Sequence, residues 1–461
     1  MEPENQNPYS INVDSDLKAT EFRLFSISSP HMKAFHLAWF SLFACFFSTF
    51  SIPPLLAVIR QDINLSDSDI GTAGIASFLG SIFSRLAMGP ICDFIGPRTA
   101  SAVISILTAP AILSMSFVST AKSFILIRFF IGFSLANFIA NQFWMSCMFS
   151  GNVVGLANGF AAGWANVGGG FTQLIMPLIY SFISNFLNIP SSTAWRISFI
   201  FPAIFQILTA VLVLTFGQDL PDGKYKRPPI RNSIDPINNK RVVIDVILNG
   251  FSNYRGWILG LIYGSCFGVE LTTDNILAGY FYNRFGVDVK AAGAIAASFG
   301  LMNLVSRPGG GVISDEMGRR FGMRGRLWGL WIVLAMAGAF CVLLGRVNSL
   351  WGSVIVMCLF SLFVQAASGL TFGVVPFVSK RSLGVISGMT GCGGTVGAVV
   401  TQLVLFSGSQ KFSTQEGISL MGIFMIASSM SIGFIYFPHL GGMFCAPNSL
   451  YPSDPNYHLL H

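Results

Sequence analysis

The chain contains twelve apolar segments, each of about the length that a helix needs to cross a lipid bilayer, roughly 20 residues. They lie near residues 36–59, 71–92, 99–120, 123–149, 153–177, 197–217, 256–280, 291–313, 327–345, 350–378, 384–406 and 417–438. Hydrophobic residues make up 52% of the chain and charged residues only 10%, which excludes an ordinary water-soluble domain. We therefore predict an all-α polytopic membrane protein with twelve transmembrane helices.

Two stretches of the sequence occur twice, which indicates that the chain consists of two related halves. Arg85, Gly89, Asp93, Gly96 and Arg98 recur as Arg307, Gly311, Asp315, Gly318 and Arg320, each 222 positions later. A glycine-rich stretch at 155–174 recurs at 384–403. We therefore predict two pseudo-symmetric six-helix halves, residues 36–218 and 251–438. Their glycines are expected to let neighbouring helices approach closely.

Polar segments precede, join and follow the two halves. Residues 1–35 show no pattern of a cleavable signal peptide. We predict that residues 219–250, which are basic and contain prolines, form a flexible linker, and that the tail at 439–461 is disordered. Most lysines and arginines outside the apolar segments fall on one side of the predicted topology, so the positive-inside rule places both ends and the linker in the cytoplasm. This topology explains the net charge of +7 without a nucleic-acid partner.

Arg85 and Arg307 each lie inside an apolar segment, about eight residues before the aspartate that ends it. At about 1.5 Å per residue this places them about 12 Å into the membrane, close to its midplane. A charge at that depth normally faces a bundle interior or a water-filled cavity and marks a substrate pathway. Because a guanidinium is planar, permanently charged and carries paired N–H donors, the two arginines predict one site for a small oxyanion.

Other polar and aromatic residues in the apolar segments each allow more than one interpretation. Asn166, in a glycine-rich segment, either contacts substrate or bonds a neighbouring helix. Tyr263, Phe267 and Trp164 either surround a flat anion with ring faces and edges or pack in the core. Arg128 lies near an outer helix end, where it snorkels or pairs with a carboxylate, or contributes to gating.

Several classes of site are not indicated by the sequence. No nucleophile–base constellation, phosphate-cradling loop or metal-ligand cluster appears, so we expect neither an enzyme nor a cofactor or metal. The eight cysteines lack C-x-x-C spacing and lie mostly in apolar segments, as expected of buried thiols.

The sequence resembles one transporter family in several stretches spread over residues 35 to 440. These are FHLAWF, GSIFSRLAMG, AGWANVGGGFTQL, YGSCFGVELTTDN and FGMRGRLWGLW. They are similar to the plant high-affinity nitrate transporters, in the nitrate/nitrite porter branch of the major facilitator superfamily. The resemblance implies the major facilitator fold and proton-coupled nitrate transport by alternating access. It also implies a multi-pass protein of the plasma membrane or the vacuolar membrane and a small single-span accessory membrane protein as a partner.

The resemblance also implies roles for individual residues. Arg85 and Arg307 correspond to the family's nitrate arginines, and Asn166 to the asparagine of its first signature. Thr395 stands where the second signature usually has asparagine, and Ala165 where the first usually has glycine. With Thr395 the sequence resembles a divergent subgroup that includes vacuolar members. By analogy with the superfamily, gating residues are expected to form a latch between the cytoplasmic helix ends: Asp93, Arg98, Asp315, Arg319 and Arg320.

Proton coupling needs a carboxylate that can take up and release a proton. Glu270 is the candidate, although it and Asp274 also fit structural pairs near the outer helix end. We further expect that the two buried arginines make the empty cavity doubly positive, so that it resists closure until an anion binds and relieves the repulsion. The alternatives are a facilitator for another small anion, such as nitrite or chlorate, and a nitrate sensor with little net flux.

Overall fold

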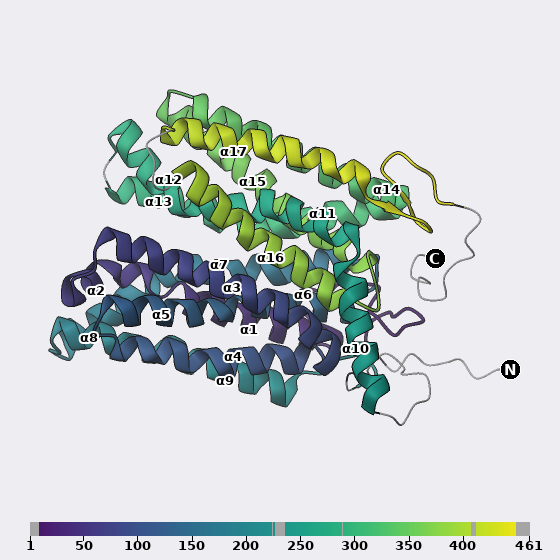
Figure 1. Cartoon of the computed structure of the whole chain (residues 1–461), viewed down its shortest axis with the longest axis horizontal. Coiled ribbons are helices and arrows are strands. Elements are labelled where there is room, and N and C mark those ends of the chain that lie inside the picture. The colour runs from purple at the N-terminus through teal and green to yellow at the C-terminus, as the bar shows by residue number, and fades with distance from the viewer. Residues whose placement is uncertain (1–8, 224, 226–235, 288, 407–411, 449–461) are drawn as a thin grey trace.

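The computed structural model describes residues 9–223, 225, 236–287, 289–406 and 412–448 (Figure 1). Long helices run side by side along the longest axis in two groups (Figure 1). The N-terminal group contains α1 (His31–Thr49), α2 (Leu56–Ile63), α3 (Asp67–Ile95), α4 (Pro97–Ser114), α5 (Ala121–Gly132), α6 (Asn137–Met148), α7 (Val154–Ser181), α8 (Ser191–Ser198) and α9 (Ile200–Phe216). The C-terminal group contains α11 (Tyr254–Tyr263), α12 (Val269–Phe285), α13 (Val289–Leu301), α14 (Asn303–Arg346), α15 (Leu350–Val374), α16 (Leu383–Thr401) and α17 (Thr414–Ser429).

The helices account for the twelve predicted membrane spans. Ten helical runs in the described residues are long and apolar enough to cross a membrane. One of them, Ala291–Arg346, contains two predicted spans, because Gly322 interrupts it with a φ of 62° and a ψ of −153°. The remaining span is the run Tyr254–Phe285, in which a π-helical turn at Gly264–Gly268 joins α11 to α12. The prediction of an all-helical polytopic fold is confirmed.

The linker and the tail differ from the sequence-based expectation. Residues 236–251 form helix α10 (Pro236–Phe251), which crosses one end of both groups (Figure 1). This helix is held in place because the Val246 carbonyl accepts a hydrogen bond from the Ser382 hydroxyl at 2.9 Å. The tail begins with a hairpin of β1 (Tyr436–Phe437) and β2 (Gly441–Gly442). The rest of the predicted flexible linker, 226–235, and of the predicted disordered tail, 449–461, lies outside the described residues.

The N-terminal segment is folded onto the end of the bundle where α6 ends, which is the end predicted to face the cytoplasm. The Ala19 amide donates to the Met148 carbonyl at 3.0 Å, and the Lys18 ammonium donates to the Ser146 carbonyl at 2.8 Å. Asp16 pairs with Lys380 of the C-terminal group at 3.5 Å. The segment therefore touches both halves, and α1 begins at His31, before the predicted start at residue 36.

The two halves meet through two diagonal helix pairs, α3 with α16 and α7 with α14. Glycines carry the closest approaches: a Cβ on Gly384 would lie 2.1 Å from the Gly89 carbonyl oxygen, and one on Gly311 would lie 2.1 Å from that of Gly155. Equivalent glycines of the two sequence repeats thus make equivalent contacts. In the described residues, most hydrogen bonds between the halves lie level with Arg85 and Arg307 or toward the end of the bundle that is predicted to face the cytoplasm. The contact of Ser81 with Thr395 lies one turn toward the other end. The bundle is therefore closed at the end predicted to be cytoplasmic.

Candidate functional site

Arg85 lies on α3 at the contact with α16 and is 1% exposed. Its Nη1 donates to the Gly391 carbonyl of α16 at 2.7 Å, and its Nε lies 3.4 Å from the Leu135 carbonyl. No carboxylate pairs with Arg85 in the described residues. Because two carbonyl dipoles do not neutralise a buried cation, Arg85 leaves a positive charge at the junction of the halves.

Arg307 lies at the equivalent place on α14 and is also 1% exposed, but it has a carboxylate partner. Its Nη2 donates to Glu270 Oε2 at 2.9 Å, and Asn303 Nδ2 donates to Glu270 Oε1 at 2.6 Å. The Nε and Nη1 atoms of Arg307 are buried without a hydrogen-bond partner in the described residues. Buried donors of a charged group are normally matched by an acceptor, so these two atoms mark a place for an anion.

Aromatic rings lie close to both guanidinium groups. The centroid of the Phe267 ring lies 5.5 Å from Arg85 Cζ and 5.2 Å from Arg307 Cζ. Phe138 adds a second ring at 5.4 Å from Arg85 Cζ. Both distances to Phe267 are within the range of cation–π attraction, so this ring helps to hold two like charges close together.

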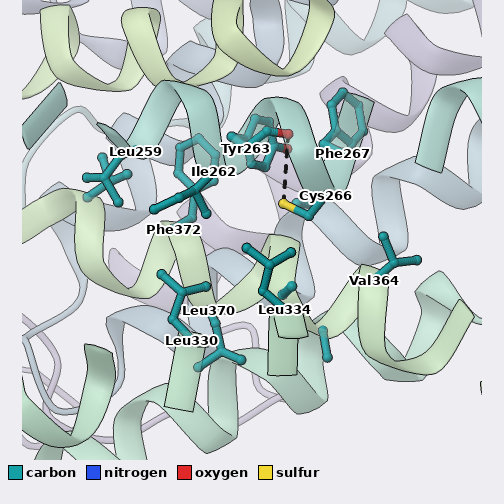
Figure 2. Packing of buried hydrophobic residues seen from close by; sticks show 14 of the residues in the cluster. Leu259, Ile262, Tyr263, Cys266, Phe267, Leu330, Leu334, Val364, Leu370 and Phe372 are labelled. Atoms are coloured by element: carbon teal, nitrogen blue, oxygen red, sulfur yellow. Dashed lines mark hydrogen bonds between the residues drawn. The ribbon is translucent and has the colours of Figure 1, made fainter. Parts of the chain in front are cut away.

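Tyr263 stacks on Phe267 with a centroid distance of 5.0 Å, and its hydroxyl is buried without a partner in the part of the chain described. Figure 2 shows both rings projecting from one helix, with Leu330 and Leu334 packed on the opposite side of Cys266. Phe372 of α15 meets the Tyr263 ring edge-on at 5.0 Å. This packing fixes the aromatic residues in the C-terminal half, which leaves the Tyr263 hydroxyl free to donate to a ligand.

The π-helical turn Gly264–Gly268 sets the direction of the residues that follow it. Its glycines allow close packing on α16, since a Cβ on Gly268 would lie 2.7 Å from the Ala398 nitrogen. A π-helical turn shifts the helical register, and such turns are frequent at functional sites. Glu270, directly after the turn, is 2% exposed and reaches Arg307 in the core of the bundle. The expectation of a doubly positive cavity is therefore wrong, because Glu270 neutralises one of the two arginines.

The remaining predicted substrate residues lie at the same contact between the halves. Asn166 of α7 has a buried Nδ2 without a partner among the described residues, one turn beyond Gly163, whose Cβ would meet the Asn303 carbonyl at 2.6 Å. Thr395 is 1% exposed, and its hydroxyl lies 3.5 Å from that of Ser81 on α3. Trp164 instead packs against Trp39 and Phe160 in the N-terminal half, so for this residue the structure supports a packing role.

Two aspartates bind the first backbone amides of helices in the opposite half. Asp93 accepts from Gly384 and Val385 at 2.9 and 3.1 Å, at the start of α16. Asp315 accepts from Gly155 and Leu156 at 3.1 and 2.7 Å, at the start of α7. A carboxylate is favoured at a helix N-terminus, because the helix dipole is positive there. The aspartates thus join the two halves at the end of the bundle predicted to face the cytoplasm.

The basic residues expected in this latch lie elsewhere. The amide of Arg98 donates to Asp219 at 3.0 Å, which ties α4 to the end of α9. Arg319 and Arg320 are exposed and both pair with Glu316. Arg128 is half-buried, with Nη1 3.5 Å from the Thr49 carbonyl at the end of α1.

Arg326 is the cation of the second latch, and sequence reasoning missed it. It is 2% exposed, and its guanidinium donates to Asp315 at 2.9 Å and to the Gly151 carbonyl of the opposite half at 2.6 Å. The chain reverses at Gly322, whose positive φ favours glycine, and this reversal brings Arg326 back to Asp315. Asp93 has no ion pair in the described residues, so the two latches differ although the sequence repeats.

Comparisons with known proteins agree with this architecture. The model of the Major Facilitator Superfamily matches residues 38–402. The chain is 63% identical to the High affinity nitrate transporter 2.7 of Arabidopsis thaliana, over 97% of this chain and 94% of that protein. The chain belongs to the plant high-affinity nitrate transporter family. A second relative, High affinity nitrate transporter 2.5 of Arabidopsis thaliana, is 57% identical over 98% of this chain and 89% of that protein.

Solved structures of the superfamily share the fold of this plant nitrate transporter family member. The human organic anion transporter MFSD10 (TETRAN) matches with a TM-score of 0.62 at 14% identity, over 87% of this chain and 99% of that chain. The superfamily transporter FucP in the outward conformation matches with a TM-score of 0.63 at 14% identity, over 86% and 97%. The protein is therefore a multi-pass integral membrane protein and not an enzyme.

Proposed function

We propose that this protein transports nitrate together with protons by alternating access, and that nitrate binds between Arg85 and Arg307. The observation that carries the proposal is the set of buried donors without partners: Nε and Nη1 of Arg307 and the hydroxyl of Tyr263. Nitrate is planar and singly charged, so the paired N–H groups of one guanidinium match two of its oxygens. The names of the relatives, which are high-affinity nitrate transporters, support the same substrate.

The charges at the site favour one anion of charge −1. Arg85 has no carboxylate partner in the described residues, and Glu270 offsets Arg307, so these three side chains together carry one net positive charge. With Glu270 ionised, one nitrate neutralises that charge, and with Glu270 protonated the site with nitrate bound keeps one positive charge. A phosphate dianion would call for additional donors, which makes phosphate a poorer fit.

Glu270 is the proposed proton carrier. It is buried beside the anion site and bonded to Arg307, so protonation of Glu270 frees Arg307 Nη2 for an anion. A proton and a nitrate that enter together leave the net charge of the site unchanged, and the cost of moving an anion into a negative compartment, about 2.3 kcal/mol per 100 mV, is cancelled. The closed cytoplasmic side then opens when Asp93 and Asp315 leave the helix ends they bind. Arg128 is a proposed gating residue at the outer end.

The test is uptake of labelled nitrate into liposomes that contain the purified protein, with and without an inward proton gradient. Arg85→Lys and Arg307→Lys are expected to abolish uptake, because lysine lacks the two-pronged geometry. Arg319→Lys, at an exposed ion pair, is the matched control and is expected to transport normally. Excess nitrite or chlorate in the same assay reports selectivity. Gradient-driven uptake that survives both central substitutions would refute the arginine site.

A second arm of the experiment adds a single-span accessory membrane protein to the liposomes. We expect the protein alone to transport, since both arginines and both latches belong to the one chain. Nitrate binding without flux, in the presence and absence of the accessory protein, would refute transport and favour a sensor.

A further inference from the structure

Asn303 has a buried side-chain amide, and only one of its two polar atoms has a hydrogen-bond partner in the described residues. It is the first residue of α14 and 3% exposed. Its Nδ2 donates to Glu270 Oε1 at 2.6 Å, whereas its Oδ1 is buried without a partner in the described part of the chain. A buried amide oxygen normally has a hydrogen-bond donor, so the unused Oδ1 points to a second arrangement in which it receives one.

The chemistry of the neighbouring carboxyl group supplies that second arrangement. An ionised carboxylate only accepts hydrogen bonds, whereas a protonated carboxyl also donates one through its O–H. An amide presents two N–H donors on one side and an acceptor oxygen on the other, so rotation of the Asn303 amide exchanges the two. Asn303 can therefore donate to Glu270 when it is ionised and accept from it when it is protonated. An arginine in the same place could serve only the ionised state.

Asn303 also stands at a discontinuity in the eighth span. Helix α13 ends at Leu301 and α14 begins at Asn303, with Met302 between them. Pro308, five residues on, has no amide hydrogen and so cannot bond the Leu304 carbonyl in the helix. The Asn303 carbonyl itself faces Gly163 of the opposite half, where a Cβ would lie only 2.6 Å away. A change at Asn303 thus acts directly on the contact between the halves.

We propose that Asn303 is the positioning residue that couples protonation of Glu270 to release of Arg307, a proposal that rests on the proton-coupled transport proposed above. A proton from the outer side binds one Glu270 oxygen, and the new O–H donates to Asn303 Oδ1. Glu270 is then neutral, and Arg307 turns its donors to the anion. When the proton leaves, Nδ2 of Asn303 again donates to the carboxylate and Arg307 returns to its ion pair.

Other titratable groups near Glu270 act on the same step. Arg307 on α14 pairs with Glu270 at 2.9 Å, and Asp274 lies one turn further along α12. Tyr263 and Cys266 lie within electrostatic range on the preceding turn. Among these neighbours only Asp274 is exposed, which makes it the nearest carboxylate to deliver a proton.

The experiment compares Asn303→Leu and Asn303→Ser with the unaltered protein in liposomes. One assay follows nitrate exchange at equal pH on both sides, and the other follows uptake driven by a proton gradient over a range of outer pH. Both variants lose the 2.6 Å bond that favours the ionised carboxylate. We expect exchange to persist, gradient-driven uptake to fall at least tenfold, and the pH of half-maximal uptake to shift by about one unit. Asn303→Gln, which keeps both amide atoms, is expected to restore the original midpoint.

Arg319→Lys, at an exposed ion pair with Glu316, is again the control. It is expected to leave both assays unchanged. A midpoint that does not move in Asn303→Ser, with gradient-driven uptake intact, would overturn the role of Asn303. Absence of gradient-driven uptake in the unaltered protein would instead overturn proton-coupled transport itself. The smaller serine variant decides the question if the leucine variant does not fold.

Discussion

Replacing Gly311 by alanine tests whether the glycine contacts hold the cytoplasmic side closed. An alanine Cβ at this position would lie 2.1 Å from the Gly155 carbonyl oxygen, 2.6 Å from its carbonyl carbon and 3.0 Å from Leu156 Cα. These are helix backbone atoms, which cannot rotate away as a side chain would. Since non-bonded carbon contacts are normally at least about 3.5 Å, α7 and α14 must separate by about 1 Å.

The separation affects one state of the transport cycle more than the other. Forcing extra atoms into a well-packed contact typically costs about 1–3 kcal/mol. In a state open to the cytoplasm α7 and α14 lie apart, so the added methyl group meets nothing and the cost falls on the closed state. The ratio of closed to open protein should therefore drop by about five- to 150-fold.

Distances between spin labels measure this ratio. Labels at Asn152, in the turn between α6 and α7, and at Phe321, near the Gly322 bend, are both exposed and lie in opposite halves. Cys358 and Cys445, the two cysteines that are not buried, are first replaced by serine. We expect Gly311→Ala to increase the population with the longer distance and to lower nitrate uptake.

Gly309→Ala is the matched control, since a Cβ there has nothing within 4 Å. It changes the same chemical group two residues away and should leave the distance distribution and the uptake rate as they were. An unchanged distribution in Gly311→Ala, with the protein folded, would refute the inference that this contact holds the closed state. The reasoning applies equally to Gly384, whose Cβ would meet Gly89.

Three further predictions follow from the latches, the aromatic residues and the N-terminal segment. Asp315→Asn should open the cytoplasmic side more than Asp93→Asn in the same label experiment. The reason is that it leaves Arg326 buried without its carboxylate partner, a loss of about 3–5 kcal/mol. Equal effects of the two substitutions would contradict the inferred difference between the two latches. Tyr263→Phe keeps the ring and removes one hydrogen-bond donor, so nitrate affinity measured by calorimetry should fall about five- to tenfold. An unchanged affinity would show that the hydroxyl does not bind nitrate. Burial lowers the pKa of Lys18 from 10.5, so the unfolded chain holds the proton more tightly. Thermal stability should therefore rise with pH as the pH approaches 10.5 from below, and Lys18→Met should reduce that rise.

The sequence predicts the spans and the halves well because both depend on local pattern. Apolar length defines each helix, and the duplicated motif aligns Arg85 with Arg307 at one depth without any knowledge of packing. The close contact of Gly155 with Gly311 follows from the same repeat, because small residues at equivalent positions favour helix contacts. The roles of the site residues in transport remain predictions.

The two ion pairs that the sequence did not predict depend on a change of helical register and on a reversal of the chain. The π-helical turn before Glu270 changes the helical register, and this change lets Glu270 reach Arg307. A prediction that assumes a regular α-helix, with residues i and i+4 on one face, does not contain that change. Arg326 reaches Asp315 only because the chain turns at Gly322. An available signal was charge itself: a buried arginine normally has a partner, and Glu270 is an acidic residue within an apolar segment.

The way the N-terminal segment is attached decides where a reporter can be fused to this protein. Asp16 and Lys18 connect the cytoplasmic ends of both halves, so a bulky fluorescent protein or affinity tag directly before them pulls on contacts that change during transport. The β1–β2 hairpin, by contrast, is bonded in the described residues to the C-terminal half, where Arg255 donates to the Tyr436 carbonyl. A reporter placed beyond the hairpin therefore moves with one rigid half, and its signal follows location and abundance without disturbing the transport cycle.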